Sequence, residues 1–248
     1  MEELKTDFIL TDADVVYLDN HLIVINKPPG VLVQADKDGS PSIEDAAKLY
    51  LKEKFDKPGN VFATAAHRLD RPVGGLVVIA RTSKALVRMN AMFQTREISK
   101  IYLALVGGKP ETYKWLRHWI KRNDVKNKVW TYTYQRGDAK QADLAYWQIA
   151  KDQEISMVMV RLFSGRHHQI RAQLSLEKLP ILGDAKYGVR KMREEEVCLY
   201  SYAIEFTHPV TKEIVRLLGK IPDQGPWKSF SKPTKEQLDE AFALAFKE

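Results

Sequence analysis

Hydrophobic residues in this chain recur with two spacings, and the two-residue spacing of strands is the more common. Strands are expected over residues 21–26, 31–34, 76–80, 101–106, 129–134, 144–149, 156–163, 197–206 and 213–218. The apolar residues of 76–80 and 156–163 do not alternate cleanly with polar ones, which indicates strands that are buried on both faces.

Four segments have the three- or four-residue spacing of helices instead. They are 41–55, a segment that begins at Thr82 or Ser83, 167–176, and the tail from Thr234 onward. A Thr or Ser at the start of the second segment is suited to cap a helix. Thr234 and Gln237 form the pattern of a capping box, so we expect a docked amphipathic helix in the tail.

Several strands follow one another without a helix between them, which argues against a doubly wound parallel sheet. The pattern predicts an α+β fold with a mixed, mostly antiparallel sheet and flanking helices. We interpret residues 1–13 as a leader, 14–225 as one domain, and 226–248 as a tail that carries the amphipathic helix.

Charge and cysteine content limit the classes of function. The 248 residues include 39 Lys and Arg against 32 Asp and Glu, a formal charge of +7, which favours a polyanionic partner but can also serve solubility alone. The single cysteine, Cys198, lies in an apolar run and is expected to be a buried thiol in a reducing cytoplasm. The sequence contains neither a signal-peptide pattern nor an apolar run of about 18 residues, so no membrane association is expected.

An aspartate between two arginines is the first candidate for chemistry. Asp70 lies in the run AAHRLDRPVGGLVVIA, with Arg68 and Arg71 beside it. A neighbouring guanidinium lowers the pKa of an Asp by about 1–3 units, which keeps the carboxylate ionised as a nucleophile or base. Gly74 and Gly75 allow close approach of a ligand or of a neighbouring backbone segment.

A second basic motif, GRHHQIR, occupies residues 165–171. Arg166 and Arg171 offer paired donors that suit a phosphate or carboxylate, and on a helix His167 and Arg171 would share a face. A solvated basic helix start is the plain alternative. Positive charge at a helix start opposes the helix dipole, however, which indicates an anionic ligand or a buried acid nearby.

Five motifs in a fixed order give the chain a recognisable pattern. They are Asn26-Lys27-Pro28-Pro29-Gly30, His67-Arg68-Leu69-Asp70, Lys100-Ile101-Tyr102, the GRHHQIR motif and Gly183-Asp184-Ala185-Lys186-Tyr187-Gly188. Over about residues 14–222 this pattern resembles the RluA family of RNA pseudouridine synthases, in a form without the N-terminal S4 domain. The resemblance implies the pseudouridine synthase fold, with a bent sheet and a central catalytic cleft.

The resemblance also implies roles for individual residues. Asp70 would attack the target nucleoside or remove a proton from it, and Arg171 would pair with Asp70. Tyr102 would pack against the uracil ring, and Arg68 would fill the gap that a flipped uridine leaves. Substrate-binding roles are expected for four further residues: His67, Arg166, His168 and Gln169. For His67, shaping the catalytic loop is a more plausible role than proton transfer.

The implied reaction is an isomerisation of uridine in ribosomal or transfer RNA. It breaks the N1–C1′ bond and joins C5 to C1′ without any redox change, so no cofactor and no metal ion are expected. RNA is the expected partner, and a monomer without an obligate protein partner is expected. Two alternatives remain open: a non-catalytic RNA-binding or ribosome-assembly module, and a metal-dependent phosphodiesterase, for which the sequence lacks ligand spacing.

The chain departs from the family pattern at Val73-Gly74, where many members carry Thr-Ser. RNA affinity is expected to come from the domain's own surface, because the chain lacks an S4 domain. Residues 111–140 are the candidate surface, since they hold eight Lys and Arg, three Asp and Glu, and interleaved Trp and Tyr. The same alternation is typical of a half-buried strand, so we expect most rings in the core and the cations facing RNA.

Overall fold

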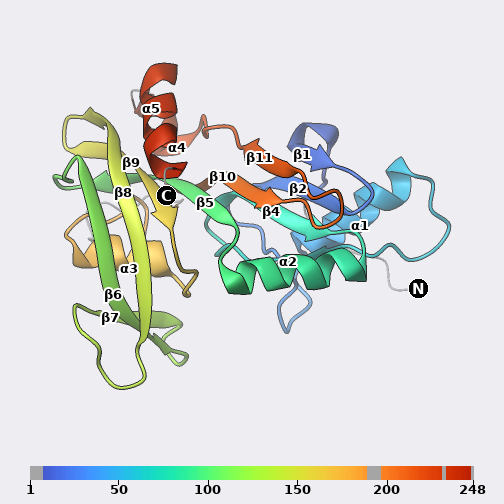
Figure 1. The fold of residues 1–248 in the computed structure, drawn as a ribbon, viewed down its shortest axis with the longest axis horizontal. Helices are drawn as coiled ribbons and strands as arrows, with labels where there is room; N and C mark the ends of the chain where they lie inside the picture. Colours follow the sequence, from blue (N-terminus) through green and yellow to red (C-terminus); the bar gives the residue numbers. More distant parts are fainter. Residues whose placement is uncertain (1–7, 189–196, 231–232, 247–248) are drawn as a thin grey trace. The chain divides into compact units, whose positions relative to one another are not determined.

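The computed structural model describes residues 8–188, 197–230 and 233–246, and it divides the chain into two compact units (Figure 1). The first unit comprises Met1–Ile98 and Ser201–Lys220, and the second comprises Ser99–Tyr200 and Ile221–Glu248. Each unit is therefore built from two separate stretches of the chain. The single domain expected over 14–225 stays a prediction.

The first unit is a small sheet with two main helices. Its elements are η1 (Asp12–Asp14), β1 (Val15–Leu18), β2 (Leu22–Lys27), α1 (Ile43–Lys54), β3 (Thr64–Ala65), β4 (Gly74–Ala80), α2 (Ser83–Thr95), most of β10 (Leu199–Thr207) and β11 (Ile214–Leu218). The strand order is β1-β2-β4-β10, with β11 beside β10 and β3 beside β4.

One part of the core of the first unit lies between its sheet and α2. All seven residues of β4 are buried, which confirms the strand expected from the apolar run at 76–80. The Thr82 hydroxyl accepts a hydrogen bond from the amide of Ala85 (3.1 Å) and caps α2, as the sequence indicates. Met89 on this helix is fully buried against Leu76 and Val78 of β4.

At Gly75 the backbone of β10 lies close to β4. Its φ is +110°, and a Cβ added there would lie 2.3 Å from the carbonyl oxygen of Ser201. A side chain at residue 75 would therefore both strain the backbone and collide with β10. The close approach predicted for this glycine is made by a neighbouring strand.

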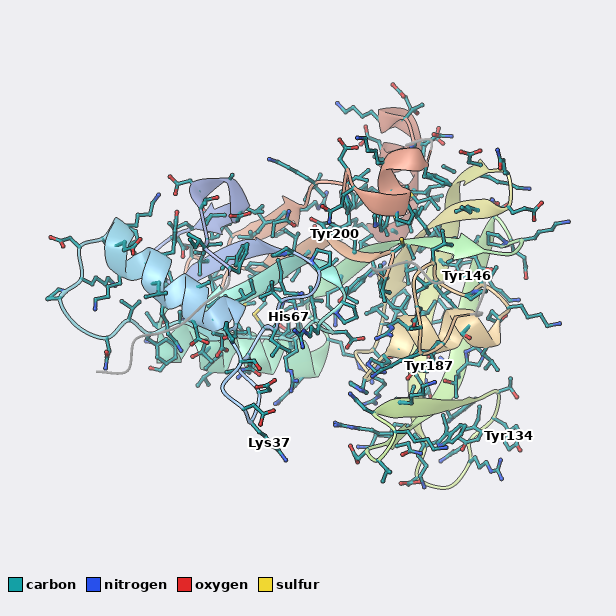
Figure 2. The ribbon with its side chains drawn as sticks, turned by 180° about the vertical axis from the view of Figure 1, so that it is seen from behind. Lys37, His67, Tyr134, Tyr146, Tyr187 and Tyr200 are labelled. Atoms are coloured by element: carbon teal, nitrogen blue, oxygen red, sulfur yellow. The ribbon has the colours of Figure 1, made fainter. Side chains whose placement is uncertain are left out.

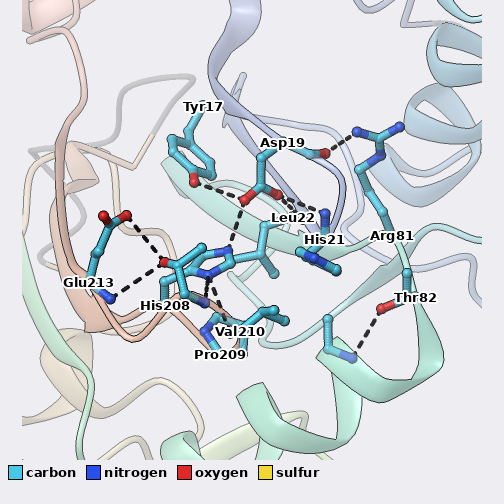
Figure 3. Close-up of polar contacts among 12 residues, drawn as sticks. Tyr17, Asp19, His21, Leu22, Arg81, Thr82, His208, Pro209, Val210 and Glu213 are labelled. Atoms are coloured by element: carbon cyan, nitrogen blue, oxygen red, sulfur yellow. Dashed lines mark hydrogen bonds and ion pairs between the residues drawn. The ribbon is translucent and has the colours of Figure 1, made fainter.

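A buried histidine connects the β1–β2 turn to the segment after β10 (Figure 3). His208 is 1% exposed, its Nε2 lies 2.8 Å from an Asp19 carboxylate oxygen, and its Nδ1 accepts from the amide of Thr211 (2.9 Å). The other Asp19 oxygen accepts from the amides of His21 and Leu22, both at 2.7 Å. His208 is therefore a buried structural residue in the loop after β10.

The second unit is a five-stranded antiparallel sheet in the order β5-β9-β8-β6-β7. Its elements are β5 (Ser99–Gly107), β6 (Tyr113–Asn123), β7 (Lys128–Tyr132), β8 (Lys140–Asp152), β9 (Ile155–Leu162), α3 (Gln169–Leu176), α4 (Gly225–Ser229) and α5 (Lys235–Phe246). Residues Ser156–Val160 of β9 are buried without interruption, which confirms a strand covered on both faces.

One face of this sheet carries α3. Ala172 on the helix packs with Ile120, Val129 and Ala142 from three neighbouring strands. These strand residues point to the same side as Tyr102 of β5, because the antiparallel registers align Tyr102 with Val160 and Val160 with Tyr146. The opposite face receives α5 near β9, where a guanidinium nitrogen of Arg161 donates to the carbonyl of Ala245 (2.6 Å).

The predicted tail helix is confirmed. The amide of Thr234 donates to the Gln237 side chain (2.8 Å), and the amide of Gln237 donates to the Thr234 hydroxyl (3.3 Å), which is the reciprocal geometry of a capping box. Ala241 and Ala245 form the buried side of α5. Cys198 is fully buried, as its apolar surroundings indicate.

Other predictions need correction. The strand expected over 31–34 is reduced to a single parallel bridge between Leu32 and Ser42. The helix predicted over 167–176 begins only at Gln169, so His167 precedes it and shares no helical face with Arg171.

No described helix is long and apolar enough to cross a membrane.

Candidate active site

Asp70 lies on the loop between β3 and β4, and neighbouring backbone segments hold this loop from two sides. The carbonyl of Asp70 accepts from the amide of Val73 (2.9 Å), which closes a turn. The carbonyl of Arg71 accepts from the amide of Gly30 (2.8 Å), and Nε of Arg71 donates to the carbonyl of Gly30 (2.8 Å). The loop is thus clamped onto the Asn26–Gly30 motif, and Arg71 uses its side chain in that clamp.

His67 anchors the other end of the same loop. Its Nε2 accepts a hydrogen bond from the amide of Val78 in β4 (3.0 Å). Its ring lies 4.8 Å from the ring of Phe93 on α2, beside which Figure 2 places it. Nε2 is an acceptor here, so it carries no proton. Arg68, one residue along, is solvent-exposed.

Lys27 is a further candidate-site residue, for which the sequence alone predicted no individual role. It ends β2 and is 1% exposed, and its Nζ donates to the carbonyls of Pro28 (2.9 Å), Val31 (2.8 Å) and Arg71 (3.2 Å). Burial lowers the pKa of Lys27 to about 7, and the negative charge of Asp70 opposes part of that fall. One buried amine therefore joins both clamped loops and acts electrostatically on Asp70.

The signal for Lys27 is present in the sequence. It follows the apolar run HLIVIN and precedes two prolines and a glycine, a position where a solvated lysine would interrupt a buried strand. The long aliphatic stem of a lysine permits burial when carbonyl oxygens receive its amine.

In the second unit, Tyr102 lies in β5 and is 6% exposed, on the sheet face that α3 covers. Lys100, two residues earlier on the same strand, points to the same side. A Cβ at Gly165 would lie 3.3 Å from Nζ of Lys100, so the glycine leaves space for this amine. Burial lowers the pKa of Lys100.

Arg171 is 3% exposed on α3 and binds Asp184 with two parallel hydrogen bonds. Nε donates to Oδ2 (2.7 Å) and Nη2 to Oδ1 (2.8 Å). Burial would raise the pKa of Asp184, but Arg171 and the amides of Lys186 and Tyr187 outweigh it and hold that pKa below its ordinary value. Asp184 is therefore a buried acid beside the basic helix start, one of the two possibilities that the helix dipole indicated.

His168 caps α3 with a left-handed backbone (φ 51°) and connects the helix start to Tyr187. Its Nδ1 lies 2.8 Å from the Tyr187 hydroxyl, and the same hydroxyl accepts from the amide of Val129 (2.8 Å). Figure 2 shows Tyr187 beside α3. The Cζ atom of Arg171 lies 5.4 Å from the centroid of that ring. His168 and Tyr187 thus position the helix that carries Arg171.

Gln169 and Arg166 shape the loop before α3. The Gln169 carbonyl oxygen accepts from the Ser164 hydroxyl and from the amide of Arg166, both at 2.9 Å, and its amide nitrogen donates to the carbonyl of Asp143 (3.0 Å). Nε of Arg166 donates to the carbonyl of Gln141 (3.2 Å). Gln169 is 3% exposed, and these contacts give it a structural role. Its predicted contact with the substrate stays a prediction.

The predicted site residues fall into two groups. The first unit carries Asp70, His67 and Arg68, and Lys27 joins them. The second unit carries five: Tyr102, Arg166, His168, Gln169 and Arg171. The structure gathers the members within each group, whereas the predicted pairing of Asp70 with Arg171 joins the groups and stays a prediction.

Comparison with known proteins points to one family. Residues 21–176 match the family model described as RNA pseudouridylate synthase. The chain is 31% identical over 229 residues to the dual-specificity RNA pseudouridine synthase RluA of Pasteurella multocida, covering 89% of this chain and 92% of that protein. It is 28% identical over 232 residues to the tRNA pseudouridine synthase C of Haemophilus ducreyi, covering 86% of this chain and 93% of that protein.

Some relatives are longer. The chain is 29% identical over 216 residues to the uncharacterized RNA pseudouridine synthase MG370 of Mycoplasma genitalium, covering 82% of this chain but 66% of that protein. Among solved structures, the human RNA pseudouridylate synthase domain containing 1 is similar with a TM-score of 0.71 at 22% identity, over 98% of both chains. That likeness confirms the predicted fold class.

Proposed function

The chain belongs to the family of RNA pseudouridylate synthases, and from this premise we propose that it isomerises uridine in ribosomal or transfer RNA to pseudouridine. The observation that carries the proposal is the placement of Asp70. Its loop is clamped on both sides, and the buried amine of Lys27 lies beneath it. The names of the relatives in Pasteurella and Haemophilus support RNA as the substrate.

Asp70 is the proposed catalytic carboxylate. The reaction breaks the bond from N1 of uracil to C1′ of the ribose, turns the base, and joins C5 to C1′, while C5 loses a proton and the freed N1 gains one. A carboxylate can promote these reaction steps by attacking the base or the sugar, or by abstracting a proton. Each route requires a carboxylate, and Asp70 lies close enough to the buried Lys27 amine for its charge to oppose part of the fall in the pKa of Lys27.

Arg171 is the proposed partner of Asp70 from the second unit. Its two hydrogen bonds to Asp184 fix the plane of the guanidinium, and a guanidinium held in one orientation loses little entropy when it binds a second carboxylate. In this proposal Arg171 places a guanidinium beside the Asp70 carboxylate.

Tyr102 and Arg68 are proposed to stabilise the flipped-out state of the uridine. Tyr102 packs against the uracil ring once the uridine leaves the helix stack, a step that costs a few kcal/mol in paired RNA. The exposed guanidinium of Arg68 occupies the space that the base vacates. Loops and bulges are the preferred targets, because their bases are already unstacked.

The test is Asp70→Asn, with Asp38→Asn as the matched control at an exposed loop aspartate. RNA labelled with tritium at C5 of uridine releases tritium to water when C5 joins C1′. The wild type and Asp38→Asn are expected to release tritium, and Asp70→Asn is expected to lose release entirely while its circular dichroism spectrum and RNA affinity stay unchanged. Normal release by Asp70→Asn would remove Asp70 from the mechanism. RNA binding without release by the wild type would favour a non-catalytic module.

A further inference from the structure

One face of the second unit exposes a row of aromatic and cationic side chains that the proposed chemistry does not use. We call it the outer strip. It consists of Tyr113, Trp115, Arg117, Trp119 and Lys121 of β6 with Trp130 and Tyr132 of β7. The register places them on one side, because Trp119 lies opposite Tyr132 and Lys121 opposite Trp130. Leu116, His118 and Ile120, which alternate with them, are buried on the other side.

The exposure of these rings is unusual for a sheet. Tyr113 is 49% exposed, Trp115 43% and Trp130 51%. Large apolar groups gathered on one surface cost free energy in water and commonly mark a binding site. Part of the same sheet face is covered, since α5 lies against β9 and Ala145 is 1% exposed. The outer strip is the part that remains open.

Two of the exposed rings are held in place by further rings. The Trp115 ring lies 4.3 Å from that of Phe163, and the Tyr113 ring lies 5.3 Å from that of Trp147. A ring that is already supported on one side loses little conformational entropy when a flat ligand covers its other side. The strip is therefore preorganised for stacking.

Cations lie among the rings. Arg117 stands between Trp115 and Trp119, and its Nε is held 2.9 Å from the buried carboxylate of Asp143. The Cζ atom of Arg136 lies 5.3 Å from the centroid of the Tyr132 ring. Over 111–140 eight Lys and Arg stand against three Asp and Glu, so the surroundings of the strip are positive. The complementary ligand is flat and anionic.

We propose that the outer strip binds a single-stranded segment of RNA, whose bases stack on Trp115 and Trp130 and whose phosphates face Arg117 and Lys121. Sheet faces with exposed aromatic residues bind single strands in this way, because every base has a stacking face and every phosphate a charge. Residues two apart on a strand are about 6.6–6.8 Å apart, so successive rings can receive successive unstacked bases.

This surface is separate from the candidate site in the same unit. Tyr102 and α3 lie on one face of the sheet and the outer strip on the other. The strip ends on β7, the edge strand of this unit's sheet, and Figure 2 shows Tyr134, 63% exposed, in the segment that leaves β7. RNA that passes this edge can contact both faces. The proposal deepens the proposed function and rests on it for the identity of the RNA.

The experiment compares Trp115→Ala, Trp130→Ala and their double variant with Phe62→Ala, an aromatic residue of the first unit that is 41% exposed. The probe is a fluorescently labelled ten-residue oligouridylate, measured by anisotropy at several salt concentrations. Each strip variant is expected to lower affinity about five- to hundredfold, and Phe62→Ala to leave it unchanged. Lys121→Gln is expected to reduce the salt slope by about 0.7, the value for one phosphate contact with a single strand.

Unchanged oligouridylate affinity in the double variant would overturn the proposal, as would self-association of the wild type that the double variant abolishes without any change in RNA affinity. Tritium release on cellular RNA separates this result from the main proposal. Tritium release together with unchanged RNA affinity in the double variant would reject RNA binding by the outer strip and support the isomerase activity. RNA binding that depends on the outer strip, without tritium release by the wild type, would support the strip proposal and reject the isomerase activity.

Discussion

Replacing Lys27 with methionine tests how the first unit holds its Asp70 loop. Methionine has a similar length and no charge, so it fills the space but removes the hydrogen bonds to the carbonyls of Pro28, Val31 and Arg71. Buried carbonyls left without donors cost about 1–3 kcal/mol each. We expect Lys27→Met to lower the free energy of unfolding by a few kcal/mol at pH 9.

The pH dependence of this loss follows from the pKa of Lys27. The folded pKa is about 7, against an ordinary value of 10.5, so between these values the unfolded chain binds more protons than the folded one. The Lys27 contribution to stability therefore rises with pH across this window and is smallest below pH 7. At about 1.4 kcal/mol per pKa unit, we expect it to rise by about 2 kcal/mol from pH 7 to pH 9.

Urea unfolding of the wild type and of Lys27→Met at pH 6.5, 7, 8 and 9 measures this contribution. The difference between the two proteins removes the titration of every other group that they share. We expect the difference to widen with pH. A difference that stays constant from pH 6.5 to pH 9 would refute the reasoning and would mean that the three carbonyls keep the amine charged throughout.

Two further changes test the close contacts described above. Gly75→Ala is expected to destabilise the protein by at least about 2 kcal/mol, because its φ is +110° and its Cβ would lie 2.3 Å from the Ser201 carbonyl oxygen; a small loss of stability in thermal unfolding would contradict this packing. Asp184→Asn leaves the buried Arg171 without its counter-charge and is expected to cost about 3–5 kcal/mol. Urea unfolding measures that loss, and an unchanged midpoint would show that the pair contributes nothing.

Spacing alone predicts much of the fold. The buried strand at 76–80, the Thr82 cap and the Thr234 capping box follow from local chemistry, because each depends on residues within a few positions of one another. Strand β6 was missed for a physical reason. Its exposed positions carry Trp and Tyr, and its buried ones include Leu116, His118 and Ile120, so hydrophobicity does not alternate although burial does.

In the candidate site too, some features could be predicted from the sequence and others could not. Asp70, Tyr102 and Arg171 were named from motifs, and His67 was expected to shape its loop, but the contacts that position them link segments far apart in sequence. Arg71 reaches Lys27 across 44 residues, and Arg171 reaches Asp184 across 13. The spacing of hydrophobic and polar residues does not predict contacts between residues so far apart in the sequence. The helix dipole indicated that an acid or an anion belonged near GRHHQIR, and only the structure identifies the acid as Asp184.

The interleaved make-up of the two units constrains the order in which the chain can fold. The core of the first unit includes Ile204 and Phe206 of β10, but its β4 ends at Ala80, roughly 120 residues earlier. A ribosome adds about 5–20 residues per second, so the apolar edge of β4 waits on the order of ten seconds for its neighbour. The entire stretch Ser99–Tyr200 is synthesised in that interval, so the unit that begins first is completed late.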